Sequence, residues 1–208
     1  MPLIDEENNH LDVKLMSDVA SSFSTKNGLI IDDNGNQWYL WRIDALDSWW
    51  RFFEEVIDAP MGRKLANAAC DEEEILLENN DFNFNGFFRK KKASAALEGR
   101  WKLHGWGIPN ISSLSFESVG LTPVFAGILQ AGMEKINSSR YRMLWEEKSP
   151  QTTLLTLEPT SIPLAKSKSV LPLKEKGEPL LIELESGWRM NGLGHFMLPV
   201  GMFNRLNM

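Results

Sequence analysis

The chain has 208 residues, of which 43% are hydrophobic and 24% are charged, and its formal net charge is −6. This length and composition are typical of a one-domain globular protein, whose core needs no disulfide or metal to fold. The negative charge disfavours broad electrostatic contact with nucleic acid, so nucleic acid is not an expected partner.

The number of cysteines and the N-terminal residues indicate the cellular compartment in which the protein is expected. Cys70 is the only cysteine, which excludes an internal disulfide framework, and we expect it to be a small buried hydrophobe. Residues 1–15 lack the basic start and apolar core of a signal peptide, and no run of about 18 apolar residues occurs. We therefore expect a cytoplasmic protein with no membrane partner and no metal.

Near the N-terminus the sequence predicts an arm with a helical stretch, and then a β-hairpin. The helical stretch covers residues 13–23. Residues 29–31 and 37–41 are short strand candidates, and the turn signal DDNGN lies between them.

Two helices are predicted next. Asp44 is a suitable N-cap for the first, and its apolar residues recur at spacings of three and four, which indicates one buried face. These residues are Leu46, Trp49, Trp50, Phe53, Val56 and Ile57. The second helix covers residues 60–69 and can continue through the acidic stretch 71–78.

The middle of the chain predicts a loop, a basic helix and two strands. Residues 78–88 combine asparagines with phenylalanines, which we expect to anchor this loop to the body. A short helix over residues 89–97 would end at Gly99, because glycine favours helix C-termini. Residues 101–106 and 111–119 are strand candidates, and the second of them alternates apolar and polar side chains.

A further helix and hairpin follow. Thr122 can cap a helix that has Pro123 at its first position and continues to Ile136, with small residues that allow a close neighbour. Residues 140–147 and 152–158 alternate in the manner of paired strands.

The C-terminal part differs in composition from the rest. Residues 158–179 are rich in proline and lysine and predict an exposed connector, and residues 180–186 are a strand candidate. We expect a single α+β domain with an N-terminal arm over residues 1–158. Residues 159–208 are expected to form the connector and an appendage that packs on the body or on a partner subunit.

The histidines show no metal-ligand spacing. His10, His104 and His195 are far apart, and no acidic partner lies at a recognisable offset. We expect His104 at the surface, where Gly105 and Gly107 permit a bulge or turn.

Two charge runs favour solvated surfaces. Residues 71–74, DEEE, could supply paired carboxylates, but a solvated helical face explains them better, with Glu72 best placed to face inward. Residues 89–92, RKKK, follow Phe87 and Phe88, a combination found at single-strand nucleic-acid sites. Given the net charge, a solvated helix start or a contact with an acidic partner is favoured.

The order of segments from residue 40 to residue 158 resembles a known family. The helices LDSWWRFFEEVI and MGRKLANAA come before GWG, the small-residue-rich helix LTPVFAGILQAGMEKI and the closing strands RYRMLWEEKSPQTTLLTLEP. This order resembles the ligand-binding domain of the 4-vinyl reductase type, which is related to heme-based gas sensors and vesicle-tethering subunits.

The resemblance implies helices packed on an antiparallel sheet, a pocket for a small apolar or aromatic molecule, and dimerisation. It also implies that Trp106 packs on the helix of residues 123–136. Family members often carry cysteines at the closing hairpin, but WEEKSPQTT has none here, so no metal ligand is carried over.

The fold we expect is α+β, an antiparallel sheet with helices packed on it. The first functional hypothesis is a non-catalytic small-molecule-binding or sensory domain, in the form of a homodimer. Its expected pocket residues are Trp49, Phe53, Trp106, Phe116, Phe125 and Met133. No residue pattern identifies a cofactor.

Two alternatives stay open. In the first, the aromatic residues and the Met-rich tail form subunit contacts of an assembly protein. In the second, the protein is an enzyme of unknown reaction, for which Glu72, His104 and Arg142 are the first candidates.

Overall fold

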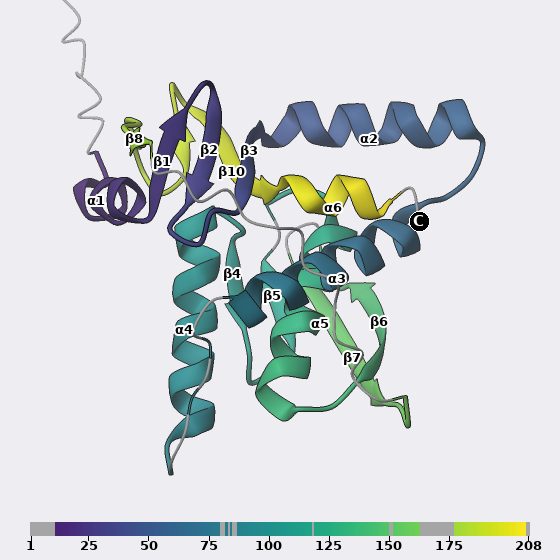
Figure 1. The fold of residues 1–208 in the computed structure, drawn as a ribbon. Helices are drawn as coiled ribbons and strands as arrows, with labels where there is room; N and C mark the ends of the chain where they lie inside the picture. The colour runs from purple at the N-terminus through teal and green to yellow at the C-terminus, as the bar shows by residue number, and fades with distance from the viewer. Residues whose placement is uncertain are drawn as a thin grey trace, which may run out of the picture.

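The computed structural model describes residues 11–79, 82, 84, 87–117, 119–149, 152–162 and 177–206. These residues form helices packed against two antiparallel sheets, which confirms the predicted α+β class (Figure 1). Residues 80, 81, 83, 85 and 86 of the predicted loop at 78–88, and residues 163–176 of the predicted connector at 158–179, lie outside the described residues.

The helices of the described part are α1 (Val13–Ser22), α2 (Ile43–Ile57), α3 (Gly62–Asn79), α4 (Arg89–His104), α5 (Thr122–Asn137) and α6 (Val200–Arg205). The first sheet has the order β8 (Glu178–Pro179), β1 (Phe23–Lys26), β2 (Leu29–Asp32), β3 (Gln37–Arg42), β10 (Leu193–Pro199) and β9 (Arg189–Met190). The second has the order β4 (Ile108–Asn110), β5 (Ser115–Glu117), β7 (Thr152–Pro159) and β6 (Tyr141–Glu147).

The first sheet combines strands from both ends of the chain. β3 pairs with β10 in an antiparallel register that sets Trp38 opposite Pro199 and Arg42 opposite His195. Figure 1 shows the yellow C-terminal strand beside the dark N-terminal strands. The C-terminal segment therefore packs on its own body.

The predicted hairpin at residues 29–41 is confirmed, and β1 precedes it. The Asp32 carboxylate closes the β2–β3 turn by accepting hydrogen bonds from the backbone N–H of Asn34 and Asn36 and from the Trp38 indole. The β1–β2 turn was not predicted. Asn27 and Gly28 both have positive φ there, as a tight primed turn requires.

The second hairpin, β6–β7, is also confirmed, whereas the strand predicted over residues 111–119 is present only in part and the one predicted over residues 180–186 is wrong. Of the described residues in 111–119, only Ser115–Glu117 form a strand, β5. Residues 180–186 form an extended segment without a ladder, because their backbone groups bond elsewhere. The Leu180 N–H donates to the Phe23 carbonyl, and the Leu184 carbonyl accepts from the Asp12 N–H.

The predicted helices α1, α2, α3 and α5 are present, but two expected caps are wrong. α2 begins after Arg42, which carries no capping side chain, and Asp44 lies in its first turn. Leu121 stands at the N-cap of α5, one residue before Thr122. Small residues do allow close packing here, because a Cβ on Gly127 would lie 2.1 Å from the Ala66 carbonyl oxygen on α3.

The prediction that α4 ends at Gly99 is wrong, as is the strand predicted over residues 101–106. Ala93, Leu97, Trp101 and His104 are buried at helical spacing, so one face of α4 lies on the core from Ala93 to the end of the helix. A glycine inside a helix costs only about 1 kcal/mol, and burial of this face outweighs that cost. The helix ends at Gly105, whose φ is +75°.

The GWG segment joins α4 to the second sheet. Gly107 has φ +94°, and a Cβ on it would lie 2.1 Å from the Glu117 carbonyl oxygen. Trp106 is fully buried, and its indole N–H donates to the Met197 carbonyl on β10 at 2.6 Å. Among the described aromatic residues, Trp101 and Phe196 contact the Phe125 ring of α5, at 6.2 and 5.7 Å between centroids.

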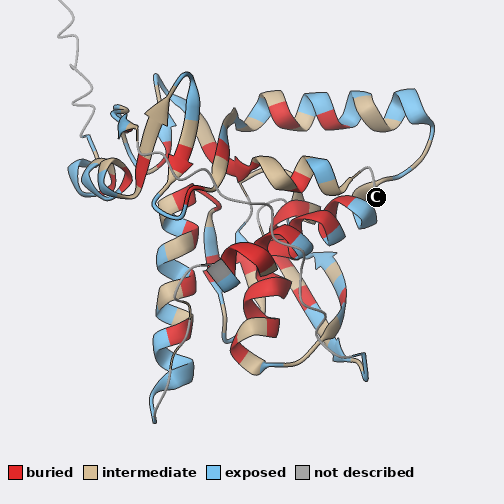
Figure 2. Cartoon of the chain, in the orientation of Figure 1, coloured by how far each residue is buried: buried red, intermediate tan, exposed pale blue. Residues whose placement is uncertain are grey.

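The acidic run on α3 is not a solvated face: Glu72 faces inward as expected, and the prediction is wrong for Glu73 and Glu74. Glu72 and Glu73 are buried, Glu74 is half-buried, and only Asp71 is exposed (Figure 2). Each of the three glutamates pairs with an arginine from another segment. These pairs are Glu72–Arg205, Glu73–Arg100 and Glu74–Arg140.

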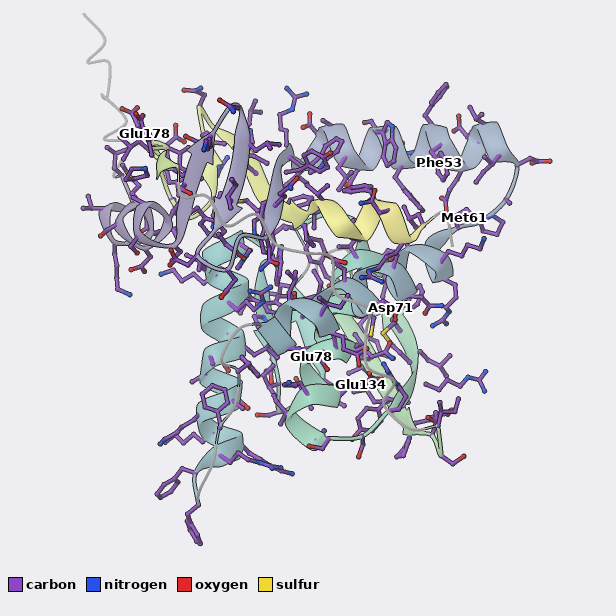
Figure 3. All side chains as sticks on the ribbon, viewed as in Figure 1. Phe53, Met61, Asp71, Glu78, Glu134 and Glu178 are labelled. Carbon is purple, nitrogen blue, oxygen red and sulfur yellow. The ribbon has the colours of Figure 1, made fainter. Side chains whose placement is uncertain are left out.

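Arg140 is held by two carboxylates. It contacts Glu134 at 2.8 Å and Glu74 at 3.1 Å, and Glu134 also accepts from the Tyr141 backbone N–H and the Gln130 amide. Glu134, labelled in Figure 3, is buried. The start of β6 is thereby fixed to α3 and α5.

We predict opposite effects of alanine at the two glycines near the end of α4. Gly107→Ala should destabilise the protein by about 2 kcal/mol or more, because the new Cβ meets backbone at a positive φ. Gly99→Ala should stabilise it by about 0.5–1 kcal/mol, because nothing lies within 4 Å of its Cβ position and alanine favours helix. Urea unfolding of both variants tests this, and equal effects would contradict it.

We predict that the Glu73–Arg100 pair is strongly coupled. The guanidinium contacts Glu73 through two hydrogen bonds of 2.6 and 2.8 Å. Arg100→Met alone should cost about 3–5 kcal/mol, because it leaves a buried carboxylate unpaired, whereas Arg100→Met with Glu73→Leu should cost far less. A double-mutant cycle measured by chemical unfolding gives the coupling, and additive effects would exclude it.

Candidate functional site

A cleft of about 830 Å³ lies between the C-terminal end of α4, strand β4 and the β9–β10 hairpin. Its inner wall is apolar. The apolar lining residues are Leu15, Ile43, Trp101, Ile108, Pro109, Ile111, Val119 and Trp188. A cleft of this volume and lining is typical of a small-molecule site.

The polar residues of the cleft carry more positive than negative charge. They are Glu98, Lys102, Asn110, Ser112, Ser186, Arg189 and His195. Lys102 and Arg189 supply two cations from α4 and β9, whereas Glu98 supplies one carboxylate, and all three are exposed. A bound molecule with an apolar body and an acidic group would match this distribution.

Trp188 forms the wall contributed by the β9–β10 hairpin. Its indole N–H donates to the Lys102 carbonyl near the end of α4 at 2.9 Å, and its own carbonyl accepts from the His195 N–H at 2.8 Å. The indole lies directly over Gly105, since a Cβ there would come within 2.7 Å of the ring. These contacts hold the end of α4, Gly105 and the β9–β10 hairpin in fixed positions relative to one another.

A second indole offers an unused donor. Trp101 is fully buried and lines the cleft, and its Nε1–H has no hydrogen-bond partner among the described residues. Buried donors are normally paired, but this nitrogen is itself enclosed by protein atoms, so a ligand in the cleft does not reach it unless the wall rearranges.

The structure places the six predicted pocket residues elsewhere. Four of them, Trp106, Phe116, Phe125 and Met133, are buried in the packed core. The other two, Trp49 and Phe53, lie on α2 with their rings stacked at 5.7 Å. None of the six lines the cleft, so their role in ligand binding stays a prediction.

The cleft residues carry only a weak sequence signal. Trp188 and Arg189 follow Gly187 in a segment that the sequence suggested only as an apolar tail, and Lys102 lay in a predicted strand. A helical reading of residues 93–104 would have placed Lys102 on the exposed side of α4, next to the glycine turn.

The three enzyme candidates do not converge. Glu72 of α3 pairs with Arg205 of α6 at 2.6 Å, and Arg142 is exposed on β6. His104 lies on α4 and is 2% exposed, so its predicted surface position is wrong.

His104 belongs to an aromatic cluster rather than to the surface. Its ring lies 4.4 Å from Trp38 and 4.6 Å from Trp106 between centroids, and Phe23 meets it edge-on. The Arg100 guanidinium lies over both tryptophans, at 5.6 and 5.3 Å. Burial, together with the Arg100 charge, lowers the pKa of His104 well below its usual range, so the ring is neutral.

Cys70 is buried as predicted, and burial raises the pKa of its thiol well above its usual range. No group of three or more histidine, cysteine, aspartate or glutamate side chains in the described part of the chain could hold a metal ion. None of the helices described has the length and apolar character needed to cross a bilayer.

Comparison of the chain with protein-family models, with curated proteins and with solved structures gave no match. The resemblance to the 4-vinyl reductase type therefore stays a prediction.

We predict a stability loss in mild acid that depends on His104. In the unfolded chain His104 protonates near pH 6.5, whereas the buried ring does not, so the free energy of unfolding falls as the pH drops below about 6.5. The loss should be on the order of 1 kcal/mol at one pH unit below that value and vanish above neutrality.

The check compares the wild type with His104→Gln and His104→Phe. Urea unfolding at pH 7.5 and 5.5 should give a steeper decline for the wild type than for either variant. Both variants lower stability at every pH through lost packing, so the readout is the difference in slope. Equal slopes would show that the ring is accessible to protons in the folded state.

Proposed function

We propose that the protein is a non-catalytic small-molecule-binding domain whose ligand occupies the cleft between α4, β4 and the β9–β10 hairpin. The observation that carries this proposal is the cleft itself. Its volume of about 830 Å³ and its mostly apolar wall, with a few polar groups at defined positions, match those of ligand sites.

The polar residues narrow the ligand class to small apolar or aromatic acids. Lys102 and Arg189 come from two different elements, α4 and β9, and either can pair with a carboxylate while the aromatic or aliphatic body rests on Trp188 and the exposed Ile108. The exposed Glu98 would repel a second negative charge, which favours a monoanion.

A sensory role fits the way the cleft is built. Its walls come from the end of α4 and from a hairpin that is continuous with β10, and β10 pairs with β3. A ligand that bridges α4 and the hairpin would tighten the contact between the Trp188 indole and the Lys102 carbonyl. We propose a cytoplasmic location, as the single cysteine suggested.

We predict that 1-anilinonaphthalene-8-sulfonate, an aromatic monoanion, binds in the cleft. Ser112→Trp should abolish this binding, because Ser112 is exposed and lines the cleft, so a large side chain there fills the space. Lys102→Gln and Arg189→Gln should each weaken binding roughly two- to fivefold, which is the range expected for exposed ion pairs. Fluorescence titration gives the affinities.

Matched variants control for the substitutions themselves. Ser113→Trp introduces the same side chain one residue away, outside the cleft, and Lys90→Gln removes a lysine from the far end of α4. Both should bind the probe like the wild type. Binding that survives Ser112→Trp would refute the cleft as the site.

The expected preference of the cleft for a negatively charged ligand is tested by comparing two probes. 2-Naphthoate should bind more tightly than 2-naphthalenemethanol, which has the same rings and no charge. The preference should vanish in the variant with both Lys102→Gln and Arg189→Gln. Native mass spectrometry of freshly purified protein would show any retained natural ligand.

A further inference from the structure

Two phenylalanines and four cations form an exposed tip at the start of α4. Phe87 is 100% exposed and Phe88 is 65% exposed, and their rings meet edge-on with centroids 5.6 Å apart. The next four side chains are exposed cations, Arg89, Lys90, Lys91 and Lys92. We call residues 87–92 the α4 tip.

The α4 tip stands clear of the rest of the described structure. The buried face of α4 begins at Ala93, one turn after the first residue of the helix. Figure 1 shows the first turns of α4 reaching beyond both sheets, and Figure 2 shows this end of the helix as exposed. The two rings present roughly 300 Å² of apolar surface, a patch size that marks interaction sites.

The cations surround the helix and do not line one side of it. Consecutive residues of an α-helix point about 100° apart, so four in a row cover every direction around the axis, within roughly 6 Å along it. No acidic residue occurs between Phe87 and Glu98. The tip therefore has an apolar end and a ring of positive charge directly behind that end.

This arrangement matches the surface of an anionic bilayer. One headgroup layer is about 5–8 Å deep, so all four cations lie among the headgroups when the two rings reach the boundary with the acyl chains. A flat anionic surface meets cations that point in every direction, whereas a protein groove meets only one side of a helix. Apolar insertion and a basic patch are also the two signals that together give stable membrane binding.

Single-stranded nucleic acid fits the tip less well. Its bases stack on the faces of aromatic side chains that are set along a basic groove. Here the planes of the two rings stand at 81° to each other, and the cations surround a helix end. The geometry therefore favours a lipid surface over a nucleic-acid strand.

We propose that the α4 tip binds the surface of anionic phospholipid bilayers, with Phe87 and Phe88 inserted and residues 89–92 among the headgroups. The expectation of no membrane partner rests on the lack of a spanning segment, and a surface contact needs none. The net charge of −6 does not prevent this contact, because charges more than about 8 Å away are largely screened at physiological ionic strength.

The ligand cleft lies at the opposite end of α4, around Lys102 and Gly105, and no residue of the tip lines it. The membrane contact therefore does not depend on the proposed function, and loss of one leaves the other intact.

Vesicle co-sedimentation tests the proposal. The wild type should sediment with phosphatidylcholine vesicles that contain about one-third phosphatidylserine, and should stay in solution with phosphatidylcholine alone. Phe87→Ser with Phe88→Ser should weaken binding about tenfold or more, because the apolar insertion is lost. Lys90→Gln, Lys91→Gln and Lys92→Gln together should weaken it on the order of a hundredfold, because each cation near an anionic surface contributes about fivefold.

Matched variants control for these substitutions. Phe52→Ser with Val56→Ser removes two apolar side chains of α2 that are each 66% exposed. Lys14→Gln with Lys64→Gln and Lys148→Gln removes three exposed lysines elsewhere. Both controls should bind like the wild type. All four variants should keep the wild-type unfolding temperature, since every substituted side chain is exposed.

A fluorescent label tests which part of the chain enters the bilayer. Cys70 is buried, so a thiol-reactive nitrobenzoxadiazole dye labels an exposed engineered cysteine selectively. The dye attached to Phe88→Cys should brighten when anionic vesicles are added, because it moves into an apolar environment. The dye attached to Phe52→Cys should not change.

A wild type that does not sediment with anionic vesicles at low ionic strength would overturn the proposal. Vesicle binding that both tip variants retain would overturn it as well. Tip-dependent binding of a single-stranded oligonucleotide, without vesicle binding, would assign the tip to nucleic acid instead.

Discussion

The arrangement of this fold depends on three consecutive glutamates of α3. Glu72, Glu73 and Glu74 each pair with an arginine of a different segment, namely the C-terminal helix, α4 and the start of β6. A buried carboxylate without its arginine costs several kcal/mol, so any other placement of these segments is strongly disfavoured. The aromatic core supplies the hydrophobic stabilisation, and the ion pairs decide which segments meet on α3.

The sequence predicted the elements that local interactions determine. The β2–β3 hairpin, the amphipathic α2, the small-residue helix α5 and the β6–β7 hairpin follow from turn residues and periodicity, and the structure contains all four. The sequence predicts α4 too short, because Gly99 is a typical helix C-terminus. The buried residues at 93, 97, 101 and 104 continue the helical spacing past it. The DEEE run was misjudged because its arginine partners are remote in sequence.

The cleft could not be predicted in the same way. The chain has enough large aromatic residues to line a pocket, but the fold uses Trp106, Phe116 and Phe125 to fill the core. The cleft arises instead where the end of α4 meets a hairpin more than eighty residues away, through the Trp188 contact to Lys102 at a sequence separation of 86. The contact between α4 and this hairpin depends on the topology of the whole chain, which the spacing of apolar residues in the sequence does not reveal.

The sheet made from both ends of the chain has a consequence for biosynthesis. The Ser24 hydroxyl accepts from the Gly177 N–H at a separation of 153 residues, and β3 finds its partner β10 only once residues 193–199 have been made. Until then β3, with Trp38 and Trp41, is an unpaired edge on the nascent chain, and such edges invite pairing with other chains. A partly synthesised chain therefore exposes the β3 edge that β10 covers in the folded protein.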